Sequence, residues 1–153
     1  MGDTEPTTSD RPATPVWVAS LKLNHFRNYS QLKLDLDQRH VVLTGENGAG
    51  KTNLLEAVSF LSPGRGLRRA GYDKVAQQLS QEDLPNGDAQ AGTWAVHVAM
   101  QGAEGPVEIG TGLQAGPNGV DPQRKVHING AVSRSADSLL EHARVLWLTP
   151  AMD

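Results

Sequence analysis

The stretch that decides the expected fold is a glycine-rich run of eight residues: Gly45, Glu46, Asn47, Gly48, Ala49, Gly50, Lys51 and Thr52. It fits the pattern G-x-x-x-x-G-K-[ST], in which glycines let successive backbone N–H groups converge on phosphate oxygens. The apolar run 41–44 precedes it, and apolar residues at helical spacing follow it over 53–61. A loop between a strand and a helix places the positive helix N-terminus against a bound anion. The sequence therefore predicts a site for a nucleoside triphosphate.

The last two residues of this loop have separate expected roles. Lys51 would reach the outer phosphates as a flexible point charge, and the Thr52 hydroxyl would be a ligand of Mg²⁺. The alternative is a chance match, because 16 of the 153 residues are glycine. The strand and helix signals on either side weaken that alternative. A dinucleotide-binding fingerprint fits poorly, because G-x-G-x-x-G needs a different glycine spacing from that of Gly45, Gly48 and Gly50.

The composition is that of a soluble protein with one domain. A chain of 153 residues can bury a single core, and its formal net charge of -3 gives no overall attraction to nucleic acid or anionic membranes. The absence of cysteine excludes disulfides and thiolate metal sites and agrees with a cytoplasmic location. No apolar run approaches the ~18 residues of a membrane span. Residues 1–15 are polar, acidic and proline-bearing, so we expect a disordered tail followed by a globular part over 16–153.

Strand signals lie on both sides of the phosphate loop. Before it, 16–23 is strand-like, 32–37 alternates apolar and charged residues, and 37–40 is the expected turn. After it we expect a short helix within 72–80 and strands at 93–100, 107–113 and 124–128. Turns are expected at 85–88, 101–105 and 114–119, and the pair Asn129-Gly130 predicts a hairpin that returns 131–133 onto 126–128. The last expected elements are a short helix at 136–142 and a buried apolar strand at 145–148.

This order of elements favours one architecture. A small P-loop kinase would continue after its first helix with another buried parallel strand and another helix, whereas here at least three antiparallel strands intervene. The expected fold class is therefore α/β: the N-terminal half of a P-loop NTPase head of the ABC or SMC-like type, with an attached antiparallel β-subdomain.

Four segments carry a resemblance to a known family. They are L-K-L-N-H-F-R-N-Y at 21–29, the phosphate loop with the start of its helix at 45–58, G-R-G-L-R at 64–68, and H-I-N-G at 127–130. From about residue 16 to its end, the chain resembles the N-terminal part of the RecF family, the SMC-like ATPases of bacterial recombinational repair. Many ATPases share the phosphate loop. Its combination with F-R-N-Y at 26–29 and G-R at 64–65 is much more specific to RecF.

The resemblance implies a cytoplasmic protein of DNA replication, DNA repair and the SOS response to DNA damage, with ATP and Mg²⁺ as its cofactors. In that mechanism ATP joins two heads into a homodimer that clamps DNA, single-stranded or duplex and at gaps, and hydrolysis releases it. The implied protein partners are the mediators RecR and RecO. These properties are expectations from the resemblance and do not follow from composition or spacing.

Several features of a complete family member are not recognisable in the sequence. They are a signature segment of the Ser-Gly-Gly type, a strand ending in paired acidic residues, and a switch histidine. Residues 147–153 resemble the point where RecF begins its nucleotide-sensing loop and enters the arm domain. We therefore expect a truncated portion without the arm domain and the C-terminal lobe. Such a portion would bind nucleotide weakly and would not turn it over, which leaves its status as an enzyme open.

Two further groups of residues are candidates for a role in binding. Arg27 and Asn28 follow an early strand; the residues alone favour a polar turn, and the resemblance implies a pair near the bound phosphates. Arg65, Arg68 and Arg69 lie in a glycine-rich loop, where they form either a solvated surface or a contact to the DNA backbone. Such backbone contacts would position the DNA without reading its sequence.

Two other functions stay open at this point. The first is a nucleotide- or DNA-binding fragment without catalysis. The second is a small-molecule P-loop kinase. The β-rich part after the first helix argues against the kinase. The preference for ATP or GTP is also open, because the phosphate loop makes no contact with the base.

Overall fold

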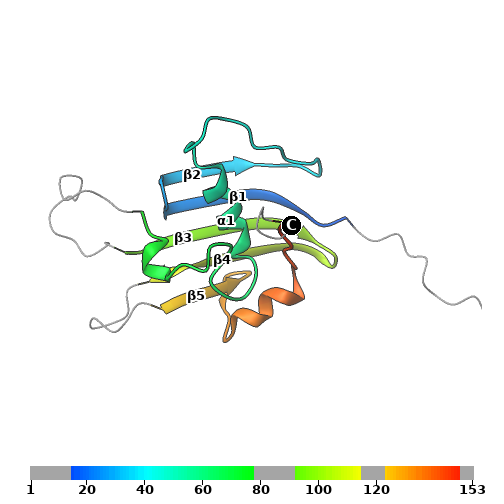
Figure 1. Cartoon of the computed structure of the whole chain (residues 1–153). Coiled ribbons are helices and arrows are strands. Elements are labelled where there is room, and N and C mark those ends of the chain that lie inside the picture. The colour runs from blue at the N-terminus through cyan, green and yellow to red at the C-terminus, as the bar shows by residue number, and fades with distance from the viewer. Residues whose placement is uncertain (1–14, 78–91, 115–122, 149–153) are drawn as a thin grey trace, which may run out of the picture.

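The computed structural model describes residues 15–77, 92–114 and 123–148, and its centre is one antiparallel sheet of six strands. The strands follow the order β2-β1-β3-β4-β5-β6, so β1 lies between β2 and β3 although β3 comes much later in the chain (Figure 1). The phosphate loop and helix α1 (Lys51–Ser59) are inserted between β2 and β3 in the sequence. The predicted α/β class and the antiparallel β-layer are both confirmed.

The first hairpin brings the chain to the phosphate loop. Strand β1 (Trp17–Phe26) pairs with β2 (Tyr29–Asp35) in a register that sets Leu21 opposite Leu34. Two residues, Arg27 and Asn28, make the turn between these strands. Both predicted strands are confirmed, and β1 extends three residues beyond the predicted end at residue 23.

The other strands form a continuous meander. Strand β3 (Trp94–Gly102) pairs with β1 on one side and with β4 (Gly105–Gln114) on the other. Strand β5 (Gln123–Ile128) pairs with β4, and the turn at Asn129-Gly130 returns β6 (Ala131–Val132) onto it as predicted. The side chains of these strands alternate between a buried face and a face that points away from the helix.

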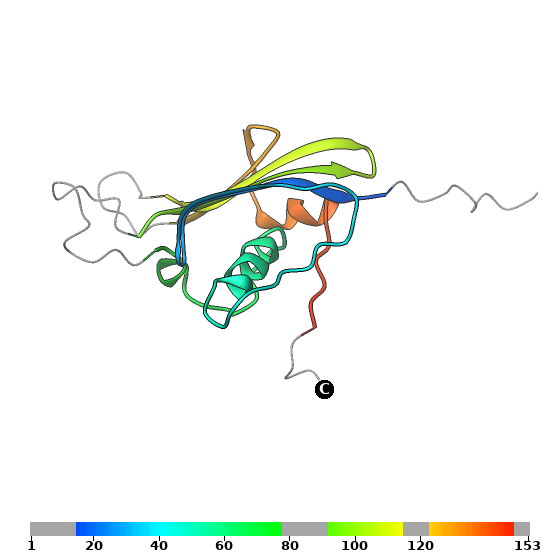
Figure 2. The same cartoon turned by 90° about the horizontal axis from the view of Figure 1, so that it is seen from above.

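Two helical elements cover the buried face of the sheet. Figure 2 shows α1 and the 3₁₀ helix Ala136–Glu141 on the same side of the strands. This 3₁₀ helix confirms the short helix expected near the end of the chain. The core combines strand and helix residues that are at most 5% exposed: Leu21, Leu23, Phe26, Ala57, Phe60, Trp94, Val96, Val98, Ile109, Val126 and Leu139. Within it, the Phe60 ring lies 4.8 Å from Trp94 and 6.0 Å from Phe26, centroid to centroid. Across the described ranges, no helix has the length and apolar character that a membrane crossing requires.

Two predicted strands are wrong. Residues 41–44 and 145–148 are both extended segments without strand pairing. Val42 is 80% exposed, and Leu146 and Leu148 are 96% and 94% exposed. A β-branched or apolar run becomes a strand only when a neighbouring strand pairs with its backbone, and no described strand lies beside these two. The composition of both segments is typical of strands, but composition does not supply the partner strand.

The remaining expectations are met in part or lie outside the described residues. The helix predicted within 72–80 is a single 3₁₀ turn, Tyr72–Lys74, followed by a bridge between Ala76 and Phe26. The turn at 101–105 is the connection between β3 and β4. The expected tail at 1–15, apart from its last residue, and the turns at 85–88 and 114–119, apart from residue 114, fall outside the described ranges.

Replacement of Gly112 by alanine should destabilise the fold, because β3 passes very close to this residue. An added Cβ at Gly112 would lie 2.3 Å from the Trp94 carbonyl oxygen and 3.1 Å from Ala95 Cα, and both neighbours are backbone. We expect Gly112→Ala to lower the free energy of unfolding by about 1–3 kcal/mol, measured by chemical denaturation. Gly110→Ala is the matched control, since its Cβ would meet nothing closer than 3.8 Å. Equal denaturation midpoints for the two variants would contradict the prediction.

Candidate nucleotide-binding site

The backbone of the phosphate loop adopts conformations that residues other than glycine rarely reach. Gly45, Gly48 and Gly50 have φ angles of 141°, 88° and 99°, a region that L-residues rarely adopt. Gly50 is also the residue before α1, and a Cβ there would lie 2.5 Å from the Tyr29 hydroxyl and 2.8 Å from Asn28 Nδ2. No side chain caps the helix start, and within the first turn the Asn53 N–H already donates to the Gly50 carbonyl oxygen at 2.9 Å. The loop therefore leads into the positive end of a helix, where the N–H groups of Lys51 and Thr52 precede the first intrahelical hydrogen bond.

Lys51 and Thr52 stand at the mouth of this loop. The Lys51 ammonium bends back over the loop and donates to the carbonyl oxygens of Gly45 and of Glu46, the latter at 2.7 Å. Residues 44–49 are exposed, as is Thr52, so the loop is open to solvent. A lysine ammonium beside a glycine-rich loop at the start of a helix suits a chain of phosphates, because the cation and the helix start both favour negative charge. The exposed Thr52 hydroxyl is available as an oxygen ligand on the first turn.

The turn between β1 and β2 contacts α1 directly. Arg27, with φ at 54°, donates from Nε and Nη2 to the two carboxylate oxygens of Glu56 at 2.8 and 2.7 Å. Its Nη1 donates to the Lys74 carbonyl oxygen at 2.8 Å. Beside it, the Asn28 side-chain oxygen accepts from Asn53 Nδ2 at 2.7 Å. Arg27 and Asn28 thus lie against the first turns of the helix, and the Arg27 guanidinium is engaged by Glu56, while their place near bound phosphates stays a prediction.

Glu56 is the residue that the sequence reasoning missed. Its side chain is fully buried, and it also accepts a hydrogen bond from Arg68 Nη1 at 3.1 Å. A buried carboxylate requires charged or hydrogen-bonding partners, and here it has two guanidinium groups. The cluster of Arg27, Arg68 and Glu56 has one net positive charge next to the phosphate loop. The only available sequence signal was an acidic residue, one turn after Thr52, that is flanked by the apolar residues 54–55 and 57–58.

The three arginines of the glycine-rich loop have different surroundings. Arg68 donates to Asn53 Oδ1 at 2.8 Å as well as to Glu56, which ties it to the first turns of α1. Arg65 and Arg69 are exposed and have no ion-pair partner within the described ranges. Sequence reasoning grouped all three as one surface. The structure separates Arg68 from the other two, because its guanidinium is held on α1.

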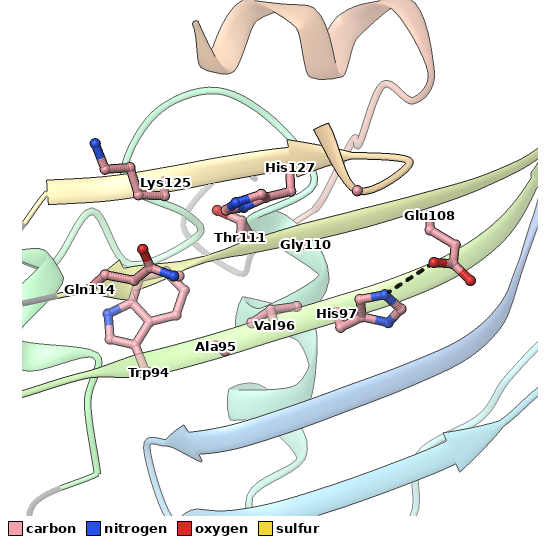
Figure 3. A pocket seen from close by; sticks show the side chains of 12 residues that line it. Trp94, Ala95, Val96, His97, Glu108, Gly110, Thr111, Gln114, Lys125 and His127 are labelled. Carbon is pink, nitrogen blue, oxygen red and sulfur yellow. Dashed lines mark ion pairs between the residues drawn. The ribbon is translucent and has the colours of Figure 1, made fainter. Parts of the chain in front are cut away.

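A second hollow lies on the opposite face of the sheet. Its volume is about 330 Å³, and its floor is made by small residues of β3 and β4 such as Gly110 and Gly112. Figure 3 shows that its polar side chains diverge: His97 points to Glu108, 3.8 Å away, while Lys125 points away at the other end. Since these groups do not converge on one point, the hollow offers no preformed binding geometry. The phosphate loop remains the candidate site.

Comparison with known proteins shows the family to which the chain belongs. Residues 17–143 match the family model described as the RecF/RecN/SMC N terminal domain. The chain is 58% identical over 138 residues to the DNA replication and repair protein RecF of Rhizobium meliloti, a match that covers 90% of this chain. It is 51% identical over 145 residues to the protein of the same name from Brucella suis, covering 94% of this chain. The chain spans about a third of the length of these relatives, 34% in both cases.

Solved structures show the same fold at low sequence identity. One is the recombination mediator protein RecF with ATP, in the RecFOR pathway, with a TM-score of 0.71 at 22% identity over 89% of this chain and 33% of that one. Another is the SMC head domain from Thermotoga maritima, with a TM-score of 0.58 at 18% identity over 81% of this chain and 40% of that one. The ABC and SMC-like head predicted from the phosphate loop and the β-layer is thereby confirmed. The chain belongs to the RecF/RecN/SMC N-terminal domain family, and the part of that family that it matches is the N-terminal region of RecF.

Proposed function

We propose that this chain is the ATP-binding region of a RecF-type DNA replication and repair protein. The observation that carries the proposal is the phosphate loop: three glycines in left-handed or related conformations, an uncapped helix start, and Lys51 held above them. The names of the relatives support replication and repair as the process. A RecF structure with ATP supports ATP as the nucleotide.

The residues present fit a nucleoside triphosphate with its metal ion. Gly45 to Thr52 would hold the phosphates through backbone N–H groups, and Lys51 would leave the loop carbonyls to meet the outer phosphates. Thr52 would be the protein ligand of Mg²⁺, a cation that usually keeps water and phosphate oxygens as its other ligands. Arg27 and Asn28 would act at the edge of the site. The side chain of Arg27 is long enough to reach the site from the turn between β1 and β2. When bound, the metal neutralises phosphate charge.

DNA binding would use the exposed part of the glycine-rich loop. Arg65 and Arg69 are not engaged by any described carboxylate, whereas Arg68 is held by Glu56. Arginine suits phosphate recognition, and an exposed loop can follow a DNA backbone without reading bases. We therefore assign the DNA contact to Arg65 and Arg69 first and to Arg68 only second. Association of two ATP-bound heads, and the mediators RecR and RecO as partners, complete the proposed role.

A small-molecule kinase is less well supported than this function. After α1 the described chain continues into the antiparallel strands β3 to β6, and no further parallel strand with a second helix follows within the described ranges. A kinase would use such elements to hold an acceptor next to the nucleotide. The β-layer is instead the architecture shared with the SMC head domain.

Lys51→Ala should weaken ATP binding strongly, because Lys51 is the cation at the mouth of the loop. Loss of a charge-assisted contact costs on the order of 1.5–3 kcal/mol, which corresponds to at least a tenfold rise in the dissociation constant. Titration calorimetry with MgATP and MgGTP measures this effect and also decides the base preference. Lys22→Ala is the control, since Lys22 is an exposed residue of β1 between two buried leucines. Unchanged affinity in Lys51→Ala would remove the central assignment.

A double variant, Arg65→Ala with Arg69→Ala, should reduce the salt dependence of DNA binding. Each lost phosphate contact lowers the slope of log K against log salt by about one unit, so a decrease of roughly two units is expected. ATP affinity should stay the same, because neither residue contacts α1. Arg39→Ala is the control, since Arg39 is exposed and paired with Asp37 away from this loop. If the double variant keeps both the affinity and the slope of the wild type, this part of the loop is merely solvated.

A further inference from the structure

Arg124 of β5 is a half-buried arginine that contacts the chain at the far end of α1. Its Nη2 donates to the Phe60 carbonyl oxygen at 2.6 Å, and its Nη1 donates to the Gly64 carbonyl oxygen at 2.7 Å. Two longer contacts of 3.4 Å reach the Ser62 carbonyl oxygen. The Nε group donates to Thr111 Oγ1 on β4 at 2.8 Å. One guanidinium therefore holds three carbonyl groups of the segment that leaves the helix.

No carboxylate in the described part of the chain pairs with this cation. Burial lowers the pKa of Arg124 from its ordinary value, yet a guanidinium stays charged at neutral pH. Its charge is met by the carbonyl oxygens of residues 60–64, which follow α1, and by the face of Phe60, whose ring centroid is 5.2 Å from Cζ. The charged guanidinium suits this position because the backbone carbonyl oxygens around it accept its hydrogen bonds.

The anchored segment leads directly to the nucleotide site. After Gly64 the chain turns back along the helix, and the Leu67 N–H donates to Ser59 Oγ at 2.7 Å. Gly66 permits this return, since a Cβ there would lie 2.9 Å from the Phe60 ring and from Ser59 Oγ. Arg68, which follows Leu67, then donates to Asn53 and Glu56 in the first turns of α1. The position of Arg68 therefore depends on a segment that is fixed at Phe60 and Gly64.

We propose that Arg124 is a positioning residue for the nucleotide site, because it fixes residues 60–64 and thereby places Arg68 against the start of the phosphate-loop helix. It does not touch the phosphate loop and acts through the intervening segment. The proposal rests on the proposed ATP-binding function. It assigns to a strand of the β-layer, 60 residues away in sequence from Gly64, a part in shaping the ATP site.

Three substitutions separate this role from a purely structural one. Arg124→Met removes all donors and keeps most of the side-chain length. Arg124→Lys keeps the charge but cannot serve Phe60, Gly64 and Thr111 at once. Lys125→Met changes the next residue, which is exposed on the other face of β5, and is the matched control. All affinities are measured by calorimetry at a temperature where circular dichroism shows each variant folded, so that a loss of stability alone does not alter them.

We expect Arg124→Met to weaken MgATP binding roughly fivefold and Arg124→Lys to weaken it less. Combining Arg124→Met with Arg68→Ala should weaken binding no further than the stronger single variant does, because both substitutions act through the Arg68 side chain. Hydrogen exchange at the Leu67 amide should become faster in Arg124→Met without nucleotide and stay unchanged in Lys125→Met. If Arg124→Met does not fold, Arg124→Lys replaces it in the same cycle.

The outcomes distinguish this proposal from the function on which it rests. If the wild type does not bind MgATP, the proposed function fails, and the exchange at Leu67 then reports only whether Arg124 anchors the loop. If the wild type binds and Arg124→Met binds equally well, the positioning role is overturned while the function stands. Fully additive effects of Arg124→Met and Arg68→Ala would also overturn it, because Arg124 would then act by another route.

Discussion

The buried carboxylate of Glu56 is the constraint on which the arrangement of the site depends. A charge without exposure to solvent must be compensated, and Glu56 receives hydrogen bonds from Arg27 and Arg68, which come from segments on either side of α1 in the sequence. Removing Glu56 would leave two cations facing each other, and removing either arginine would leave the carboxylate with fewer partners. The turn between β1 and β2 and the glycine-rich loop are therefore fixed to the helix by one side chain. Because this side chain lies one turn after Thr52, the charge cluster is also adjacent to the predicted phosphate position.

Helix α1 is short, and both of its ends are specified by residues outside it. At its start, Gly50 is buried against Tyr29 and Asn28, so the entry angle of the helix is set by the first hairpin. At its end, Arg124 of β5 binds the carbonyl oxygens of Phe60, the residue after the helix, and of Gly64. The nine residues of the helix are too few to be stable alone. The position of the helix therefore depends on the sheet, because β1, β2 and β5 supply the residues that hold it.

The local features of this fold were predictable, whereas its long-range contacts were not. The phosphate loop, α1, the strands and the hairpin at Asn129-Gly130 follow from periodicity, glycine placement and turn chemistry, all of which act over a few residues. The segments 41–44 and 145–148 have the composition of strands, but pairing requires a partner that composition does not reveal. The roles of Arg124 and Glu56 could not be predicted from the sequence either, because each residue contacts groups far away in the chain. An arginine on a strand is normally read as solvent-facing, and only the register of β5 with β4 shows that it points inward.

The distribution of charge fits the proposed phosphate site, although the chain as a whole is acidic. The formal net charge of -3 describes the whole sequence, but the surroundings of the phosphate loop are locally positive. Lys51 lies over the loop, the cluster of Arg27, Arg68 and Glu56 adds one positive charge, and the helix start contributes its dipole. Glu56 holds Arg27 and Arg68 in place, whereas Lys51, which donates to loop carbonyl oxygens, has to move to meet an anion. A diffuse positive surface of equal charge would attract any polyanion, whereas a fixed set of donors around a glycine loop selects an anion with the shape of a phosphate chain.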